Sequence, residues 1–197
     1  CHGNPETMVR WFPKGGPSAS SGQAAYDYDW TIFGRYLKTA MKYHHRDRIR
    51  CVAINVWGNE VRPSRHTGKM HGALVTAKDS KTGKRTNIKV PAYGTAACEA
   101  FWRPALLAVK ERLKAYGLDG KLMLGVGNDS SPPWNQVAMF RRILPGAPWF
   151  RESHYNAWGF RYDAKDRRKT VPVGCNSIVW GGAVNDPQRR RLYGWRY

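Results

Sequence analysis

The segment from Lys121 to His154 constrains the fold more than any other part of the chain, because it has the pattern of a β-α-β unit. Residues 122–126 form a short apolar run, which is typical of a strand buried on both faces. Ser131-Pro132 can supply the N-cap and the first helical position, and Pro145-Gly146 can end the helix. A second strand is predicted over 148–154. In parallel α/β folds, binding and catalytic sites are built at the carboxyl ends of such strands.

The rest of the chain continues this alternation. Apolar periodicity predicts helices over 30–43, with Asp29 as N-cap, and over 98–116. A nearly continuous apolar run predicts a strand over 49–57, and a last strand is predicted over 176–180. Between the first of these strands and the helix over 98–116, two strand-like runs flank a turn, which indicates a β-hairpin around residues 70–90.

Alternating strands and helices predict a parallel sheet, and the length of 197 residues favours one domain. A full (β/α)8 barrel typically needs ~250 residues. We therefore predict one α/β catalytic-type domain over 1–197, a partial or truncated (β/α)8 barrel of the TIM type with a β-hairpin inserted around 70–90. Two alternatives stay open: the central-to-C-terminal part of a larger barrel, and an open doubly wound sheet.

The charge of the chain points to acidic partners. Lysines and arginines exceed aspartates and glutamates by 19, so nucleic acids, anionic glycans and anionic membrane surfaces are candidate partners. A basic composition bias of the source organism would give the same charge. No run approaches the ~18 apolar residues that span a bilayer, so no membrane-spanning segment is expected. No glycine-rich phosphate-binding motif is present.

The cysteines and histidines predict neither a metal site nor a cofactor. The four cysteines, Cys1, Cys51, Cys98 and Cys175, lack C-x-x-C spacing. Cys51 lies in an apolar run and Cys98 lies beside a helix start, so buried free thiols are expected. Cys1 is either the lipidated first residue of a mature lipoprotein or an accident of where the chain begins. His66 and His71 have no carboxylate or cysteine at a spacing suitable for a shared metal ion.

Polar and aromatic residues follow each predicted strand, and parallel strands would bring them to one edge of the sheet. Flat aromatic rings suit the apolar faces of pyranose rings, planar polar groups suit sugar hydroxyls, and two carboxyl groups can supply acid and base. We predict four catalytic residues: Glu60, Asp129, Asn59 and His154. We predict six substrate-binding residues: Trp57, Asn128, Tyr155, Asn156, Trp158 and Trp180. For Trp57, Trp158 and Trp180, a place in the core is the alternative.

Several short blocks, in order along most of the chain, resemble bacterial glycoside-hydrolase-like proteins related to family 123. The blocks are residues 6–11, 33–37, 52–57, 101–104, 121–133 and 144–154. The resemblance implies a (β/α)8 barrel lacking its first strands, action on N-acetylhexosamine glycosides, and a location in the cell envelope or outside the cell. It also implies a mechanism in which the substrate's own acetamido group is the nucleophile. In that mechanism, an aspartate orients the acetamide and the adjacent glutamate is the general acid.

The chain departs from this pattern because it contains no Asp-Glu dipeptide; the nearest is Asn59-Glu60. The amide of Asn59 can accept a hydrogen bond from the acetamide N–H, but it cannot stabilise a positive oxazolinium intermediate electrostatically. Three hypotheses follow. The chain is a glycosidase-like protein with Glu60 or Asp129 as general acid, a catalytically inactive carbohydrate-binding or surface protein of the same fold, or a basic nucleic-acid-binding protein.

Overall fold

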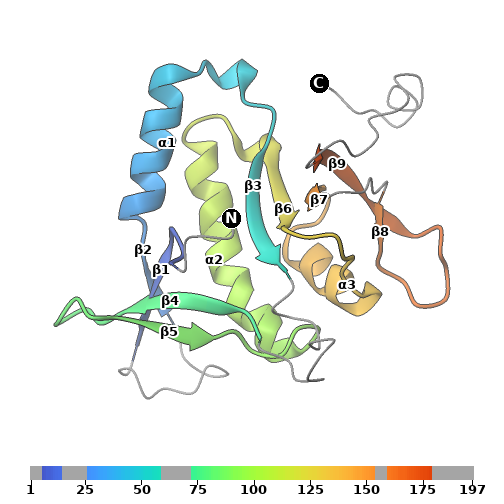
Figure 1. Ribbon diagram of the computed structural model, residues 1–197, viewed down its shortest axis with the longest axis horizontal. Coiled ribbons are helices and arrows are strands. Elements are labelled where there is room, and N and C mark those ends of the chain that lie inside the picture. Colours follow the sequence, from blue (N-terminus) through green and yellow to red (C-terminus); the bar gives the residue numbers. More distant parts are fainter. Residues whose placement is uncertain (1–5, 15–25, 59–71, 154–158, 179–197) are drawn as a thin grey trace.

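The computed structural model describes residues 6–14, 26–58, 72–153 and 159–178, which form three α-helices and two β-sheets (Figure 1). The helices are α1 (Thr31–Tyr43), α2 (Ala96–Lys114) and α3 (Trp134–Ile143). The larger sheet contains β3 (Val52–Trp57), β6 (Leu122–Val126), β7 (Trp149–Ser153), β9 (Thr170–Ile178) and β8 (Gly159–Arg161). The smaller sheet contains β2 (Tyr26–Asp29), β1 (Arg10–Pro13), β4 (Leu74–Lys78) and β5 (Arg85–Lys89). Short 3₁₀ turns precede β3 at Arg46–Arg48 and β6 at Asp119–Lys121.

The larger sheet is parallel across β3, β6, β7 and β9, and β8 pairs antiparallel with β9 at one edge. The β-α-β unit predicted for residues 121–154 is present as β6, α3 and β7. Its helix begins at Trp134 with Pro133 as the N-cap, so Ser131 lies before the cap rather than at it. Similarly, Trp30 rather than Asp29 is the N-cap of α1, although Asp29 Oδ1 accepts a 2.9 Å hydrogen bond from the Thr31 N–H.

The predicted (β/α)8 barrel is wrong. In the described part of the chain there is no closed barrel, and three helices accompany two separate mixed sheets. The hairpin of β4 and β5 does not decorate a barrel, because β4 also pairs in parallel with β1 at Ala77 and Trp11. The hairpin and the first two strands therefore make their own sheet, which lies across the lower part of Figure 1.

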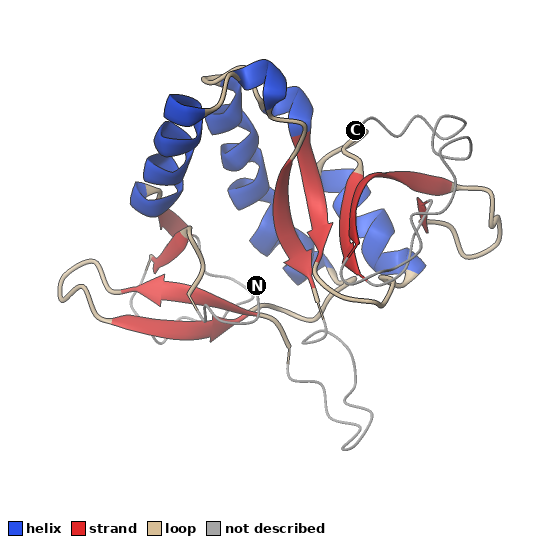
Figure 2. Ribbon diagram, turned by 45° about the horizontal axis from the view of Figure 1, so that its top comes forward, coloured by secondary structure: helices blue, strands red, loops and turns tan. Residues whose placement is uncertain are grey.

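Aromatic rings join the two sheets through α2. The ring contacts, with centroid separations between 5.4 and 6.3 Å, run without a break through Trp11, Phe101, Trp102, Phe140, Trp149 and Phe160. Trp11 belongs to the smaller sheet, and Trp149 and Phe160 belong to the larger one. Figure 2 shows the helices on one side of the larger sheet, and this aromatic cluster fills the space between them. The remaining apolar core joins the same cluster.

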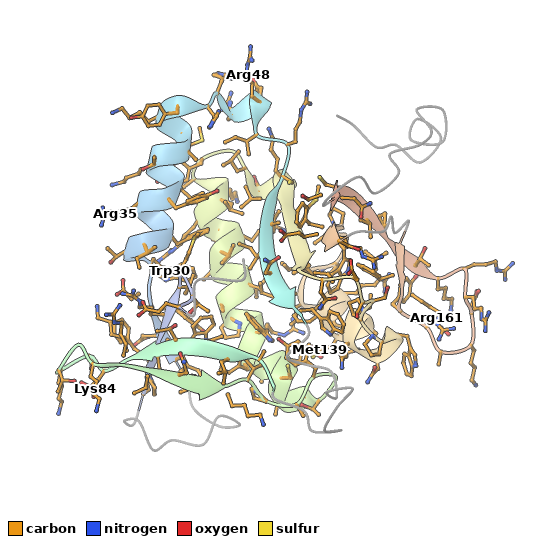
Figure 3. All side chains as sticks on the ribbon, in the orientation of Figure 1. Trp30, Arg35, Arg48, Lys84, Met139 and Arg161 are labelled. Atoms are coloured by element: carbon orange, nitrogen blue, oxygen red, sulfur yellow. The ribbon has the colours of Figure 1, made fainter. Side chains whose placement is uncertain are left out.

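Basic side chains lie on several separate parts of the described structure. Figure 3 labels Arg48 at one end of the molecule, Lys84 at the tip of the β4–β5 hairpin and Arg161 on β8, which are far apart. A polyanion-binding surface stays a prediction. Among the described helices, none has the length and apolarity required to cross a bilayer.

Candidate active site

The strand register of the larger sheet sorts its side chains into two rows on opposite faces. Paired residues on neighbouring strands point to the same side, and successive residues along a strand point to opposite sides. Asn55, Gly125, Phe150 and Cys175 are paired in sequence across β3, β6, β7 and β9, and we call them the Asn55 row. One residue further along the strands, Val126, Arg151 and Asn176 form the Arg151 row. Along β7, Trp149 and Arg151 are buried, whereas Phe150 between them is only partly buried. The face that carries Trp149 and Arg151 is therefore the one that packs against the helices.

At the carboxyl ends of the strands, Arg151 and Ser153 fix the loop that follows β6. Arg151 is only 5% exposed, and its Nη2 donates a 2.5 Å hydrogen bond to the backbone carbonyl of Asp129. The Ser153 hydroxyl donates a 2.9 Å bond to Asp129 Oδ1. In the same loop, Asn128 Oδ1 accepts from the Ser130 N–H at 2.7 Å. The exposed carboxylate of Asp129 is therefore held in a defined orientation at this edge.

The same edge has unused hydrogen-bonding capacity. Among the described residues, the Nδ2 of Asn128 and the Nε of Arg151 are buried and have no hydrogen-bond partner. Burial lowers the pKa of Arg151, and the negative charge of Asp129 opposes that change. A guanidinium remains protonated in proteins, so the edge keeps a buried positive charge beside the Asp129 carboxylate.

The opposite face carries the side chain of Asn55 and, further along β7, that of Glu152. Asn55 is exposed, and it lies over Gly125, where an added Cβ would come within 2.0 Å of Asn55 Oδ1. Glu152 follows Phe150 by two residues, so it points to this face and is partly exposed. The carboxyl edge therefore carries two carboxylates from neighbouring strand ends, Asp129 after β6 and Glu152 in β7.

Of the residues predicted from sequence, the structure places three. Asp129 and Asn128 lie at the expected edge, next to Arg151 and Ser153. Trp57 is 4% exposed, and its indole N–H donates a 2.6 Å hydrogen bond to Gln136 Oε1 of α3. This packing favours a place in the core for Trp57, since its ring offers no open face to a sugar. The other predicted site residues lie outside the described residues: Asn59, Glu60, His154, Tyr155, Asn156, Trp158 and Trp180.

Sequence reasoning missed Glu152, Asn55 and Arg151 as residues of this edge. The signal for Glu152 and Asn55 was the two-residue alternation of their strands, which puts them on the face away from the helices. No group of three or more potential metal ligands occurs among the described residues, and His66 and His71 lie outside them. The absence of a cofactor stays a prediction.

The free cysteines differ from one another in environment. Cys98 is fully buried in α2, as predicted, whereas Cys51 and Cys175 are only half-buried. Burial raises the pKa of Cys98 to about 12, which keeps its thiol protonated at neutral pH.

Together, the parallel strands and the polar residues at their carboxyl ends define an α/β domain of the type on which hydrolytic sites are built. Residues 5–148 match the family described as Glycoside hydrolase 123, catalytic domain. The chain therefore belongs to this family, and the resemblance found in the sequence is confirmed. The matched residues end before β7, so Arg151, Glu152 and Ser153 lie beyond them.

A similar fold is found in a family 123 glycoside hydrolase from Clostridium perfringens, whose structure was analysed to explain glycolipid glycan hydrolysis. The two structures align with a TM-score of 0.56 and 11% sequence identity over 96% of this chain. The alignment covers 31% of the Clostridium enzyme, so this chain spans about a third of its length. No curated protein matches the chain.

Proposed function

We propose that this domain binds and hydrolyses glycans that contain N-acetylhexosamine, using the carboxyl edge of its larger sheet. The observation that carries the proposal is the Asp129 carboxylate, which the Ser153 hydroxyl orients at that edge, in a chain of the family 123 catalytic domain. Membership of the family supports glycosidic bond cleavage as the reaction class, and the Clostridium enzyme supports a glycan substrate.

The chemistry at this edge requires a proton donor for the leaving oxygen and a group that stabilises positive charge at the sugar. Asp129 can serve one of these roles, because the Ser153 hydroxyl and the Arg151 guanidinium fix its side chain and its backbone. Glu152 on the other face is the second carboxyl group, and Glu60, which follows β3 in sequence, is a further candidate acid. The unpartnered Nδ2 of Asn128 can donate a hydrogen bond to a sugar hydroxyl or an acetamide carbonyl.

The test is release of 4-nitrophenol from 4-nitrophenyl β-N-acetylhexosaminides by the purified chain. We expect Asp129→Asn, Glu152→Gln or Glu60→Gln to lower kcat by at least ~100-fold, as loss of an acid or base typically does. Glu111→Gln is the matched control, since Glu111 is exposed near the end of α2 and away from the carboxyl ends of the strands. Turnover that none of the three variants reduces would contradict the proposal.

A catalytically inactive glycan-binding domain is the second candidate, favoured by the absence of an Asp-Glu dipeptide from the chain. In that case, N-acetylhexosamine oligosaccharides would bind without release of product. Isothermal titration of chitooligosaccharides and of N-acetylgalactosamine-terminated glycans would then show binding that Asp129→Asn weakens, while the chromogenic assay stays at background.

A further inference from the structure

The segment formed by α1 and the 3₁₀ turn that follows it carries an unbalanced positive charge. Residues 31–50 contain one acidic residue, Asp47, and six exposed lysines and arginines: Arg35, Lys38, Lys42, Arg46, Arg48 and Arg50. Asp47 pairs with His45 at 3.1 Å and with Arg46 at 3.9 Å. No carboxylate of the described residues forms an ion pair with the other five cations. Their charge is therefore available to a partner outside the chain.

On α1, the cations and two tyrosines form adjacent lines along the helix. At 3.6 residues per turn, three cations fall within about 60° of one another around the helix axis: Arg35, Lys38 and Lys42. Beside them, Tyr36 and Tyr43 are seven residues apart, so they share a second line, and they are 54% and 70% exposed. The opposite side of α1 packs into the core through Phe33 and Leu37. We call the exposed side with its three cations and two tyrosines the α1 face.

The α1 face lies away from the carboxyl edge of the larger sheet. The chain passes from α1 through the turn at Arg46–Arg48 into the amino end of β3 (Figure 1). Because β3, β6, β7 and β9 are parallel, their amino ends lie at the end of the sheet opposite the carboxyl edge. At this same end, Lys121 precedes β6 and donates a hydrogen bond to the backbone carbonyl of Arg46. Figure 3 shows Arg48 at this end and Arg35 on the side of α1 away from α2. A partner that reaches both the α1 face and the carboxyl edge must be an extended polymer.

The chemistry of the α1 face fits a polymer with repeated anionic groups and flat, partly apolar rings. Guanidinium and ammonium groups form strong hydrogen bonds with sulfates and carboxylates, and exposed tyrosine rings can pack against the apolar faces of sugars. An anionic membrane fits less well, because a helix that lies on a membrane inserts its apolar side, whereas Phe33 and Leu37 are already buried in the core. A nucleic acid has suitable charge, but a glycan is the polyanion that a glycoside hydrolase domain can also bind at its carboxyl edge.

We propose that the α1 face is a binding surface for acidic glycans, namely sulfated or uronate-containing polymers with N-acetylhexosamine units. The choice of a glycan rests on the proposed function, whereas the binding itself requires no hydrolysis. The cations pair with sulfate or carboxylate groups along the polymer, and the two tyrosines contact its rings. The polymer is thereby concentrated on the domain, and its free length extends toward the carboxyl edge.

The experiment measures binding of fluorescein-labelled heparin to the full chain by fluorescence anisotropy between ~50 and ~200 mM sodium chloride. The triple variant Arg35→Gln/Lys38→Gln/Lys42→Gln should weaken binding by at least ~10-fold and reduce the slope of log K against log salt concentration by ~2–3. The matched control, Lys81→Gln/Lys84→Gln/Arg167→Gln, removes the same charge from exposed residues elsewhere and should weaken binding by less than ~3-fold. Tyr36→Ser/Tyr43→Ser should weaken binding by at least ~3-fold with an unchanged salt slope.

Competition by unlabelled ligands identifies the partner without any variant. Heparin should displace the probe better than chemically desulfated heparin, oligothymidylate at equal charge concentration, or vesicles that contain phosphatidylserine. A nucleic acid or vesicle that competes better than heparin would overturn the proposal. Equal losses in the α1 variant and the control variant would also overturn it, because binding would then follow net charge alone.

A neutral substrate separates this proposal from the proposed function. The α1 variants should leave turnover of 4-nitrophenyl β-N-acetylhexosaminides unchanged, since these small substrates need only the carboxyl edge. Heparin binding through the α1 face without any turnover would support the α1 face and contradict hydrolysis. Turnover without heparin binding would overturn the α1 face and leave hydrolysis supported. Since all five substituted side chains are exposed, the urea midpoints of the variants should stay near that of the wild type.

Discussion

Gly125 lies in the middle of β6, where it pairs with Asn55 on β3 and with Phe150 on β7. A Cβ at this position would lie 2.0 Å from Asn55 Oδ1 and 2.9 Å from the Cα of Asn55. The side-chain oxygen can rotate away, but the Cα is part of the backbone of the paired strand. Gly125→Ala must therefore push β3 and β6 apart or twist one of them.

The magnitude follows from two opposing contributions. Forcing a methyl group into a packed site typically costs ~1–3 kcal/mol. Replacing glycine by alanine also lowers the conformational entropy of the unfolded chain, which stabilises the folded protein by ~0.4–1 kcal/mol. We therefore expect Gly125→Ala to lower the free energy of unfolding by ~1–2 kcal/mol. At an m-value of ~2 kcal/mol/M, the urea midpoint should fall by ~0.5–1 M.

Gly34→Ala is the matched control for this measurement. Gly34 lies within α1, and a Cβ there would meet nothing within 4 Å. The substitution should stabilise the protein by ~0.5–1 kcal/mol, because glycine is a poor helix former. Urea unfolding followed by tryptophan fluorescence measures both changes. Adding Asn55→Ala to Gly125→Ala should recover only part of the loss, since the clash with the backbone of β3 remains. A Gly125→Ala protein as stable as the wild type would refute the reasoning.

Two further predictions concern buried or partly buried polar contacts. The pKa of Glu99 is lowered chiefly by its hydrogen bond from Arg142, so its stabilising effect is complete above its unfolded pKa and is lost as the pH falls through the lower native value. Glu99→Gln should lower the free energy of unfolding by about 1 kcal/mol at pH 7. It should also reduce the fall of the urea midpoint between pH 7 and about pH 3. A variant whose urea midpoint falls with pH as steeply as that of the wild type would contradict this prediction. Gln136→Leu should cost ~1–3 kcal/mol, because it leaves the buried indole N–H of Trp57 unpaired, and the double variant with Trp57→Phe should recover most of that loss in the same urea assay.

The sequence predicted those parts of the fold in which strand, helix and strand follow one another locally. The unit of β6, α3 and β7 depends on apolar runs and turn residues within about 30 residues. The barrel prediction failed because it treated every strand as part of one sheet. The hairpin instead joins the amino-terminal strand, where Thr7 and Thr76 exchange hydrogen bonds across a long sequence separation. Such long-range strand pairing leaves no signal in a local pattern.

Some residues of the candidate site were predicted from the sequence and others were not. The position of Asp129 after a buried strand placed it correctly at the carboxyl edge. Glu152 was missed because its strand, WFRES, has an arginine at an inward position where an apolar residue was expected.

The unbroken line of aromatic rings has a consequence for how the protein unfolds. The rings pass from β1 through α2 and α3 to β8, so both sheets pack against the same hydrophobic core. Disrupting this packing at one sheet should therefore disrupt it at the other. Heat or denaturant should therefore melt both sheets as one cooperative unit, with near-ultraviolet and far-ultraviolet circular dichroism lost together.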